Sequence, residues 1–429
     1  MDSIRCGFLI IGSGAGGATL AKELSLHSQD VVIVERGERA QQLGSFRASL
    51  AFFDANKTTK IPRKSKEGVI LWRTLMAGGS TVVSCGNGTR CLEAELAERG
   101  IELEREFQEA ELDMQISPMQ ESLRSEGSEA ILAASHALGY EMEPMPKFID
   151  PQKCRQCGQC VFGCPHEAKW TALDYLDEAE RNGAKVFYNT SVDSVLVTDR
   201  TATGAIAIGP NGPMEILSDV TILAAGGLGT PVILQKSGIE EAGTGLFIDM
   251  LVNTYGTTAG LNLCREPTMS MVNHEFHHDK GFILSPYVNH PKMVRFMELG
   301  AKGLALSDRK LLGIMTKTAD DSSGRVHPDG TVNKAVTESD RTRLDEGAAI
   351  AAEILIKAGA DPKSITTSAP QGAHPGGTAA IGEVVDEDLQ TSTRSLFVCD
   401  GSVLPKAPGL PPILTIVALA KRLARHLTE

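Results

Sequence analysis

The chain has 429 residues, of which 42% are hydrophobic and 22% charged, and its formal net charge is −12. A chain of this length is too long for one simple hydrophobic core, so we expect two domains. The acidic net charge and the lack of a basic patch argue against a nucleic-acid binder. No apolar run is long enough to span a bilayer, so we expect no integral membrane protein. The first residues lack the pattern of a signal peptide. The nine cysteines are odd in number and unevenly spaced, which is unlike a secreted disulfide framework and favours a reducing, cytoplasmic setting.

The N-terminal segment has the pattern of a dinucleotide-binding unit. A buried strand is expected at 8–11, a helix from Ala18 to about Leu26 and a second strand at 31–34. A G-x-G-x-x-G turn follows the first strand and an acid ends the second, at Gly12, Gly14, Gly17 and Glu35. The glycines suit a tight turn, a close pyrophosphate and helix packing, and the acid suits an adenosine ribose hydroxyl. An acid at this position disfavours NADP, and the pattern leaves FAD and NAD as alternatives.

Two glycine-rich patches flank a β-branched pair at 75–88. Such a segment lets backbone pass close to a flat ligand, although a plain loop with a short strand has the same composition. Helices are expected across 92–136, and the acidic first part of this region is expected to face solvent.

A dense cysteine motif follows at 154–165. It reads C-x2-C-x2-C-x3-C-P and consists of Cys154, Cys157, Cys160 and Cys164, followed by Pro165. This spacing is typical of the loop that holds a cubane iron–sulfur cluster in bacterial ferredoxins, and Gly158 and Gly163 permit the coiling that it needs. The alternatives are free thiols or a zinc site, but zinc sites usually use two separated cysteine pairs. The fourth ligand is either Cys164 or one of the remote cysteines, namely Cys85, Cys91, Cys264 and Cys399.

The remaining elements can also be placed along the chain. We expect a helix over 170–180, strands at 185–188 and 194–197, a meander through 204–216, and a buried strand at 220–223 that leads into a helix ending near 237. Short strands fill 266–336, and Thr337 with Asp340 forms a capping box for a helix to Lys357. A strand at 395–399 and a final helix over 414–427 must return to the N-terminal sheet to be buried. The histidines at 274, 277 and 278 lack a matching carboxylate set, so a solvated or substrate-facing strand is favoured over a metal site.

Together these motifs resemble the glucose–methanol–choline (GMC) family of FAD-dependent oxidoreductases, over nearly the whole chain. The motifs that carry the resemblance are the N-terminal glycine turn with Glu35, Gly78-Gly79-Ser80-Thr81 with Cys85-Gly86, Gly226-Gly227-Leu228-Gly229-Thr230-Pro231, His374-Pro375-Gly376-Gly377-Thr378 and Asp400-Gly401-Ser402. The resemblance implies an α/β fold, with a Rossmann-like FAD-binding domain and an interleaved α+β substrate domain built on an antiparallel sheet. The expected FAD-binding domain spans 1–265 and 372–429 and includes the cysteine loop at 150–170, and the substrate domain spans 266–371.

The resemblance also implies the residues of the site. Those expected to contact FAD are Gly12, Gly14, Ala15, Gly17, Glu35, Arg36, Gly78, Gly79, Ser80, Ser84, Cys85, Val192, Ala225, Gly226, Asp400, Gly401, Pro411 and Pro412. The expected catalytic residue is His374, which takes the hydroxyl proton of an alcohol while hydride passes to the flavin. A histidine suits this role because its pKa lies near neutrality.

The sequence departs from the family pattern in three ways. A second polar residue of the family aligns with Pro411, and proline cannot donate a hydrogen bond to a hydroxyl. Either another side chain holds the alcohol, with His274, His277, Asn273 and Asn289 as candidates, or the chemistry is not standard alcohol oxidation. The chain is also short, which implies a trimmed substrate domain, and the cysteine quartet is complete.

These features predict a FAD and iron–sulfur oxidoreductase that oxidises a small alcohol, or reduces the corresponding carbonyl. The cluster, predicted as [4Fe-4S], would pass electrons singly to an external protein carrier, because a flavin takes two electrons and a cluster transfers one. The alternative is a flavin and iron–sulfur electron-transfer subunit of a larger redox complex, which the proline at 411 and the trimmed substrate domain favour.

Overall fold

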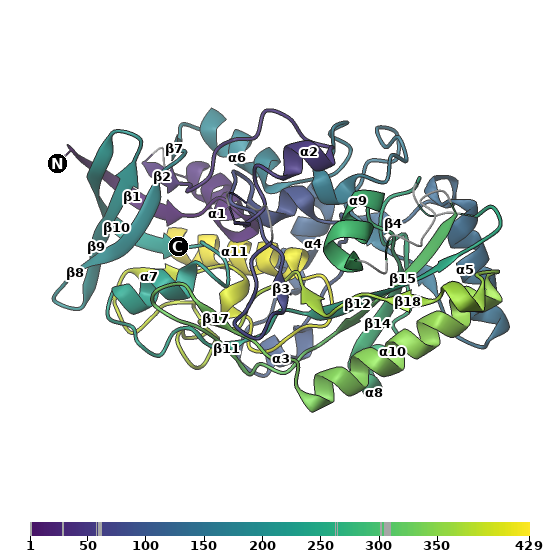
Figure 1. Cartoon of the computed structure of the whole chain (residues 1–429). Coiled ribbons are helices and arrows are strands. Elements are labelled where there is room, and N and C mark those ends of the chain that lie inside the picture. Colours follow the sequence, from purple (N-terminus) through teal and green to yellow (C-terminus); the bar gives the residue numbers. More distant parts are fainter. Residues whose placement is uncertain are drawn as a thin grey trace.

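Two β-sheets organise the chain in the computed structural model (Figure 1). The structure describes residues 2–27, 30–56, 58, 62–261, 263, 265–300, 303 and 310–429. Cys264, one of the predicted alternative ligands, lies outside the described residues.

The first sheet has the strand order β7-β2-β1-β10-β9-β8, with β20 also paired to β10. Its strands are β1 (Asp2–Ile11), β2 (Val31–Val34), β7 (Lys185–Phe187), β8 (Ser191–Thr198), β9 (Thr201–Gly209), β10 (Gly212–Leu223) and β20 (Leu396–Val398). The strands β7, β2, β1, β10 and β20 pair in parallel, whereas β8, β9 and β10 form an antiparallel meander. The meander and the expected strand at 220–223 share β10, so the prediction of a separate strand was wrong: one long strand pairs with β9 at its start and with β20 at its end.

Three helices pack together beside the first sheet: α1 (Ala15–Ser25), α6 (Ala172–Arg181) and α11 (Ile413–Thr428). The helix α1 begins three residues before the expected Ala18, directly after the glycine turn. The last helix, α11, packs against α1 and α4 (Glu104–Asp113), so the C-terminus returns to the N-terminal unit as the sequence predicts. A large apolar core fills the space between these helices and the strands.

The second sheet has the strand order β14-β15-β12-β19-β3, with β18 paired to β12. Its strands are β3 (Ile70–Leu71), β12 (Met250–Thr257), β14 (Phe282–Pro286), β15 (Leu311–Thr318), β18 (Thr366–Thr367) and β19 (Gln371–Gly372). All pairs are antiparallel except β19 with β3. This sheet draws β12 and β3 from the part of the chain before residue 266, which the sequence assigns to the FAD-binding domain. The domain limits themselves stay a prediction.

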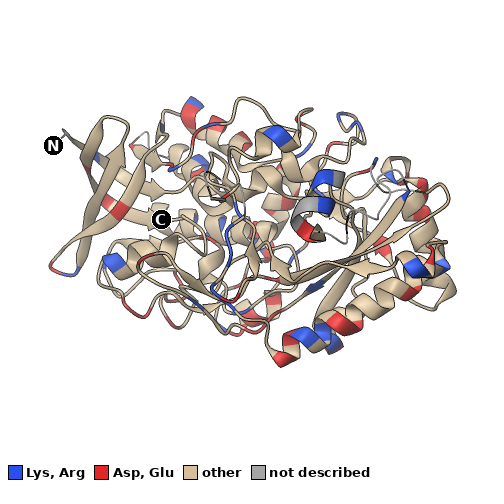
Figure 2. Ribbon diagram, in the orientation of Figure 1, with Lys and Arg blue, Asp and Glu red and all other residues tan. Residues whose placement is uncertain are grey.

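The helix α10 (Glu338–Lys357) packs against the second sheet and α5 (Glu126–Ala137), and a second apolar core lies between them. It begins with the predicted capping box: Asp340 N donates to Thr337 Oγ1 at 3.1 Å and Thr337 N donates to Asp340 Oδ2 at 3.2 Å. Figure 2 shows acidic and basic segments side by side along the N-terminal part of α10, which is typical of a solvated helix face.

Short elements connect these layers. Helices occupy the region 92–136, as predicted: α3 (Glu93–Ala97), α4 and α5. The short elements are α2 (Phe46–Ser49), η1 (Gly79–Val83), α3 (Glu93–Ala97), β4 (Ser117–Pro118), η2 (Glu121–Leu123), β5 (Glu143–Pro144), β6 (Pro146–Lys147), η3 (Cys160–Phe162), α7 (Thr230–Lys236), β11 (Thr244–Leu246), β13 (Met271–Val272), α8 (Glu275–Lys280), α9 (Pro291–Met293), η4 (Val294–Glu298), β16 (Gly324–Val326), β17 (Val332–Asn333), η6 (Pro362–Ser364) and η7 (Gly401–Val403). Among the described helices, none is both long and apolar enough to cross a membrane.

Candidate functional site

One large cavity of about 650 Å³ extends from the N-terminal glycine turn to the second sheet. His374 lines it, and so do all of the predicted FAD-contacting residues except Gly17 and Gly78. The sequence motifs that lie hundreds of residues apart therefore meet around one space.

The two exceptions do not line the cavity; they allow the backbone beside it to pack closely. A Cβ on Gly17 would lie 2.0 Å from Gly12 O, which explains why helix α1 can pack directly on the turn. Gly78 has a φ of +79° and its N–H donates to Ser13 Oγ at 3.1 Å. In contrast, a Cβ on Gly14 or on Gly226 would meet no atom within 4 Å. These two cavity-lining glycines leave open space for a ligand that approaches the backbone closely.

Glu35 links the end of β2 to the glycine turn. Its carboxylate accepts hydrogen bonds from Ser13 N at 3.1 Å, Ser13 Oγ at 2.6 Å and Gly37 N at 2.7 Å. Burial raises the pKa of Glu35, and these hydrogen bonds oppose the increase. Since Glu35 also lines the cavity, it can accept one further hydrogen bond from a ligand. The predicted contact with a ribose hydroxyl stays a prediction.

His374 lines the same cavity beside a buried acid. Its Nδ1 is 3.0 Å from Asp249 Oδ2, and Lys317 Nζ is 3.0 Å from the same oxygen. Gly409 N donates to Asp249 Oδ1 at 2.9 Å. The Asp249 side chain has no exposed surface and that of Lys317 is 2% exposed. Three groups thus converge on one buried carboxylate.

The charges of this cluster shift one another's pKa values. Burial raises the pKa of Asp249, but Lys317 and His374 outweigh burial, so that the pKa is lowered. Burial lowers the pKa of His374, Lys317 lowers it further, and Asp249 opposes both effects. Asp249 is therefore ionised and His374 is neutral at neutral pH. An ionised carboxylate only accepts hydrogen bonds, so His374 Nδ1 carries the proton and Nε2 is the basic nitrogen.

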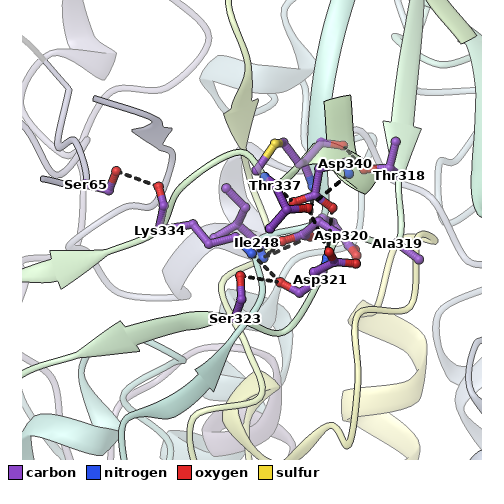
Figure 3. Close-up of polar contacts among 12 residues, drawn as sticks. Ser65, Ile248, Thr318, Ala319, Asp320, Asp321, Ser323, Lys334, Thr337 and Asp340 are labelled. Atoms are coloured by element: carbon purple, nitrogen blue, oxygen red, sulfur yellow. Dashed lines mark hydrogen bonds and ion pairs between the residues drawn. The ribbon is translucent and has the colours of Figure 1, made fainter. Parts of the chain in front are cut away.

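A second buried ion pair supports the backbone around Asp249 (Figure 3). Asp320 accepts from Ile248 N at 3.2 Å and from Met250 N at 3.1 Å, on both sides of Asp249. Lys334 Nζ lies 2.6 Å from Asp320 Oδ2, and both side chains have no exposed surface. The Asp320–Lys334 pair therefore fixes the backbone on both sides of Asp249, whose side chain contacts His374.

The four cysteines of the loop line a second, small cavity of about 20 Å³. The predicted glycines do adopt the left-handed region, with φ of +66° at Gly158 and +82° at Gly163. Burial raises the pKa of Cys154, and the nearby thiols of the other three cysteines add to the increase. Among the described residues, no three side chains of His, Cys, Asp or Glu are arranged to hold one metal ion. The metal-binding role of the quartet stays a prediction.

Two buried lysines bind the segment 82–87 beside the large cavity, and one of them, Lys169, also lines the small cavity. Lys169 Nζ donates to the carbonyl oxygens of Val82, Ser84 and Cys160 at 2.5–3.1 Å. Lys147 Nζ donates to Cys85 O at 3.0 Å, Asn87 Oδ1 at 2.5 Å and Thr268 O at 2.7 Å. Neither lysine forms an ion pair with a carboxylate in the part of the chain that the structure describes. Burial lowers the pKa of both lysines, to about 8 for Lys147, and the thiols of Cys160 and Cys85 oppose this shift.

Two sequence models of the GMC oxidoreductase family match residues 7–268 and 316–420, and the first alone covers more than half of the chain. The chain belongs to the GMC oxidoreductase family.

Several relatives share almost the full length of this GMC oxidoreductase. An uncharacterized protein of Methanocaldococcus jannaschii is 30% identical over 98% of this chain and 99% of its own. A long-chain-alcohol oxidase of Arabidopsis thaliana is 22% identical over 97% of this chain and 66% of its own. The crystal structure of a pyridoxine 4-oxidase from Mesorbium loti has a TM-score of 0.76 at 16% identity, covering 98% of this chain and 99% of its own. That likeness shows the α/β fold of the family.

The structure distinguishes among the four residues that the sequence suggests as holders of an alcohol in this GMC oxidoreductase. Pro411 lines the cavity and offers no donor. Of the four candidates, Asn289 lines the cavity, whereas Asn273, His274 and His277 do not. His277 Nε2 instead lies 2.8 Å from Pro408 O.

Sequence reasoning missed Asp249 and Lys317. A signal for Lys317 was present, because a lysine interrupts the apolar strand over 311–318, and buried lysines are rare unless they are paired. Asp249 carried no comparable signal in the sequence.

Proposed function

We propose that this protein binds FAD in the large cavity and oxidises a CH–OH group to a carbonyl, or catalyses the reverse reaction, with His374 accepting or returning the hydroxyl proton. The observation that carries the proposal is that His374, held by the buried Asp249, lines the same cavity as a dinucleotide-type glycine turn. A bound flavin supplies the two-electron acceptor for hydride.

The residues present fit FAD. The open backbone at Gly14, next to the N-terminus of α1, suits the pyrophosphate, because helix N-termini attract anions. Glu35 would bind the adenosine ribose, and Val192 would contact the adenine. The segment that contains Gly79, Ser80, Ser84 and Cys85 would lie along the flavin ring system, and Gly226 leaves open space in the same cavity.

His374 is suited to move a proton at neutral pH. The hydrogen bond to Asp249 fixes the ring and leaves Nε2 unprotonated. Burial and Lys317 keep the pKa of His374 low, so the neutral base predominates. A positioned base of this kind typically contributes a factor of about 10²–10⁴ to a rate.

The test is anaerobic reduction of the flavin by a panel of alcohols. We expect at least one alcohol to bleach the flavin of the wild-type protein. His374→Asn should slow bleaching by about 10²–10⁴-fold while the flavin stays bound. Bleaching of the His374→Asn protein at the wild-type rate would contradict the assigned role. If no alcohol bleaches the wild-type flavin but a reduced partner protein does, the electron-transfer subunit is the better account.

We also propose that Cys154, Cys157, Cys160 and Cys164 hold a [4Fe-4S] cluster through which electrons leave singly to a protein carrier. All four line one small cavity and no other cysteine does so within the described chain, which supports Cys164 as the fourth ligand. Ala168 N donates to Cys164 Sγ at 3.4 Å, and hydrogen bonds to ligand sulfurs are one means of tuning such clusters.

Charge and position both support this second proposal. A cubane with four thiolates is net negative, and it would oppose the effect of burial, which lowers the pKa of Lys147 and Lys169, and so favour their charged forms. Cys160 lines the small cavity and the next residue, Val161, lines the large one. A cluster in the quartet would therefore lie directly beside the flavin site.

Iron analysis of anaerobically purified protein tests the cluster. We expect iron and acid-labile sulfide in the wild type and their loss in Cys157→Ser. The matched control is Cys6→Ser, which changes a buried cysteine of β1 outside both cavities and should keep the iron. Equal iron contents in the Cys157→Ser and wild-type proteins would overturn the proposal.

A further inference from the structure

Alternate residues of β12 and β15 form one wall of the large cavity. In the antiparallel register Leu251 lies opposite Lys317 and Asn253 lies opposite Met315, and all four line the cavity. Side chains two residues apart share one face of a strand, so this wall is apolar in part and carries a cation and an amide at defined positions.

The Lys317 ammonium has hydrogen-bonding capacity that the protein does not use. Its Nζ lies 3.0 Å from Asp249 Oδ2, a contact that engages at most one of its donors, and no described residue other than Asp249 accepts a hydrogen bond from it. Burial lowers the pKa of Lys317, and Asp249 opposes this shift. An ammonium has three donors, and buried donors without acceptors are costly. Since Lys317 faces the cavity beside His374, the missing acceptor is expected to come from a ligand.

Lys317 and His374 lie side by side on Asp249 and both line the cavity, with His374 Nε2 as the ring nitrogen left for a ligand. His374 Nδ1 and Lys317 Nζ each lie 3.0 Å from Asp249 Oδ2, so the two are at most twice that distance apart. Pro411 lines the same cavity without a donor. We propose that Lys317 donates a hydrogen bond to the reacting oxygen of the substrate and that Asp249 positions both Lys317 and His374.

The proposal rests on the proposed oxidation of a CH–OH group. In that step the hydroxyl proton passes to His374 Nε2, the carbinol C–H bond breaks with its electron pair leaving as hydride to the flavin, and the C–O bond becomes C=O. Lys317 keeps its three protons and stabilises the negative charge that the oxygen gains as its proton leaves. In the reverse reaction the same contact polarises the carbonyl.

Lys317→Met tests this role, with Lys310→Met as the matched control because Lys310 is an exposed lysine next to the same strand. We expect Lys317→Met to slow flavin bleaching by about 10²–10³-fold, which is the usual effect of losing one donor to a developing oxyanion. Flavin content should be unchanged, Lys310→Met should behave as the wild type, and Lys317→Arg should restore part of the rate.

The pH profile separates this role from a structural one. Lys317 and Asp249 are the charged groups that shift the pKa of His374, in opposite directions. Lys317→Met should therefore move the acid limb of kcat/KM to higher pH, and Asp249→Asn should move it to lower pH. If Lys317→Met does not fold, Lys317→Gln provides the same comparison.

Three results would overturn the proposal: an unchanged rate, an unchanged acid limb, or loss of flavin from the Lys317 variants, which would assign the lysine to the cofactor. An absence of bleaching in the wild type would instead contradict the proposed function.

A different observation bears on the substrate class. Glu298 is buried, and burial raises its pKa. Tyr255, Asn289 and Asn253 donate hydrogen bonds to its carboxylate, which opposes that shift. Because both amides turn their NH₂ groups to Glu298, their Oδ1 atoms point elsewhere. Neither Oδ1 has a hydrogen-bond partner in the described chain, and both residues line the cavity.

We infer that Asn253 and Asn289 accept hydrogen bonds from a second hydroxyl of the substrate, so that the enzyme prefers diols or polyols to alkyl alcohols. Asn253 is two residues from Leu251, the partner of Lys317, which places it about 6.8 Å along the strand from the reacting end. A four- or five-carbon diol spans that distance. An alkyl chain would leave both amide oxygens without partners.

The test compares kcat/KM for 1,5-pentanediol and for 1-pentanol in the holoenzyme. We expect the diol to be preferred at least tenfold in the wild type and the preference to shrink in Asn253→Leu. Each ratio is internally controlled, because both alcohols are measured on one protein. A wild-type ratio near one would overturn the inference even if the variant fails to fold, and so would an unchanged ratio in a folded Asn253→Leu protein.

Discussion

Asp320→Asn probes the buried ion pair with Lys334 that supports the backbone around Asp249 (Figure 3). The substitution removes the charge that faces Lys334 while leaving a side chain of the same size. Both partners have no exposed surface, so the variant contains a buried lysine without its counter-ion. Breaking a buried pair in this way usually costs about 3–5 kcal/mol of unfolding free energy. The hydrogen bond from Lys334 Nζ to Asp321 O, at 2.5 Å, remains.

The assay is urea unfolding at pH 8. Burial raises the pKa of Asp320 to about 6, so the ion pair is fully formed at this pH. The double variant Asp320→Asn/Lys334→Met should recover much of the loss, because it removes both buried charges. As a surface control, Asp219→Asn breaks the exposed pair with Arg5 and should cost less than about 1 kcal/mol.

A further effect is expected on activity, because Asp320 also accepts the N–H groups of Ile248 and Met250 around Asp249. Flavin bleaching by alcohols should slow in the Asp320→Asn protein even under conditions where it stays folded. The reasoning would be refuted if Asp320→Asn were as stable as the wild type, or if the double variant were no more stable than the single one.

Two other predictions concern local geometry. Gly17→Ala should abolish flavin binding or folding, because the added Cβ would lie 2.0 Å from Gly12 O, and retention of full flavin in the purified variant would contradict this. Thr337→Ala should lower the unfolding free energy by about 1 kcal/mol through loss of the N-cap of α10, whereas an unchanged urea midpoint would show that the capping box contributes nothing.

Much of the N-terminal unit could be predicted because its signals are local. The glycine turn, the strands of the nucleotide-binding unit and the capping box of α10 each depend on residues only a few positions apart. The continuous β10 was missed for a related reason: composition changes along the strand where its neighbour changes from β9 to β20, and that change depends on tertiary pairing.

The Asp249 and Lys317 cluster could not be assembled from the sequence. It requires β12 and β15 to pair in one antiparallel register and His374 to return beside them through β19. Such pairing is set by packing between distant segments, and a single residue of slippage would turn Lys317 away from the cavity. Pro411 lines the cavity without a donor, but three of the four residues suggested as its replacement lie outside the cavity.

The most direct test of the account is an anaerobic titration of the wild-type protein with a substrate alcohol, followed by absorption and electron paramagnetic resonance spectroscopy. The account predicts bleaching of a bound flavin together with the signal of a reduced iron–sulfur cluster, because the alcohol's electrons pass from one site to the other. A flavin that bleaches without any paramagnetic iron signal would contradict the electron route through the cysteine loop. Protein that contains no flavin would contradict the account as a whole.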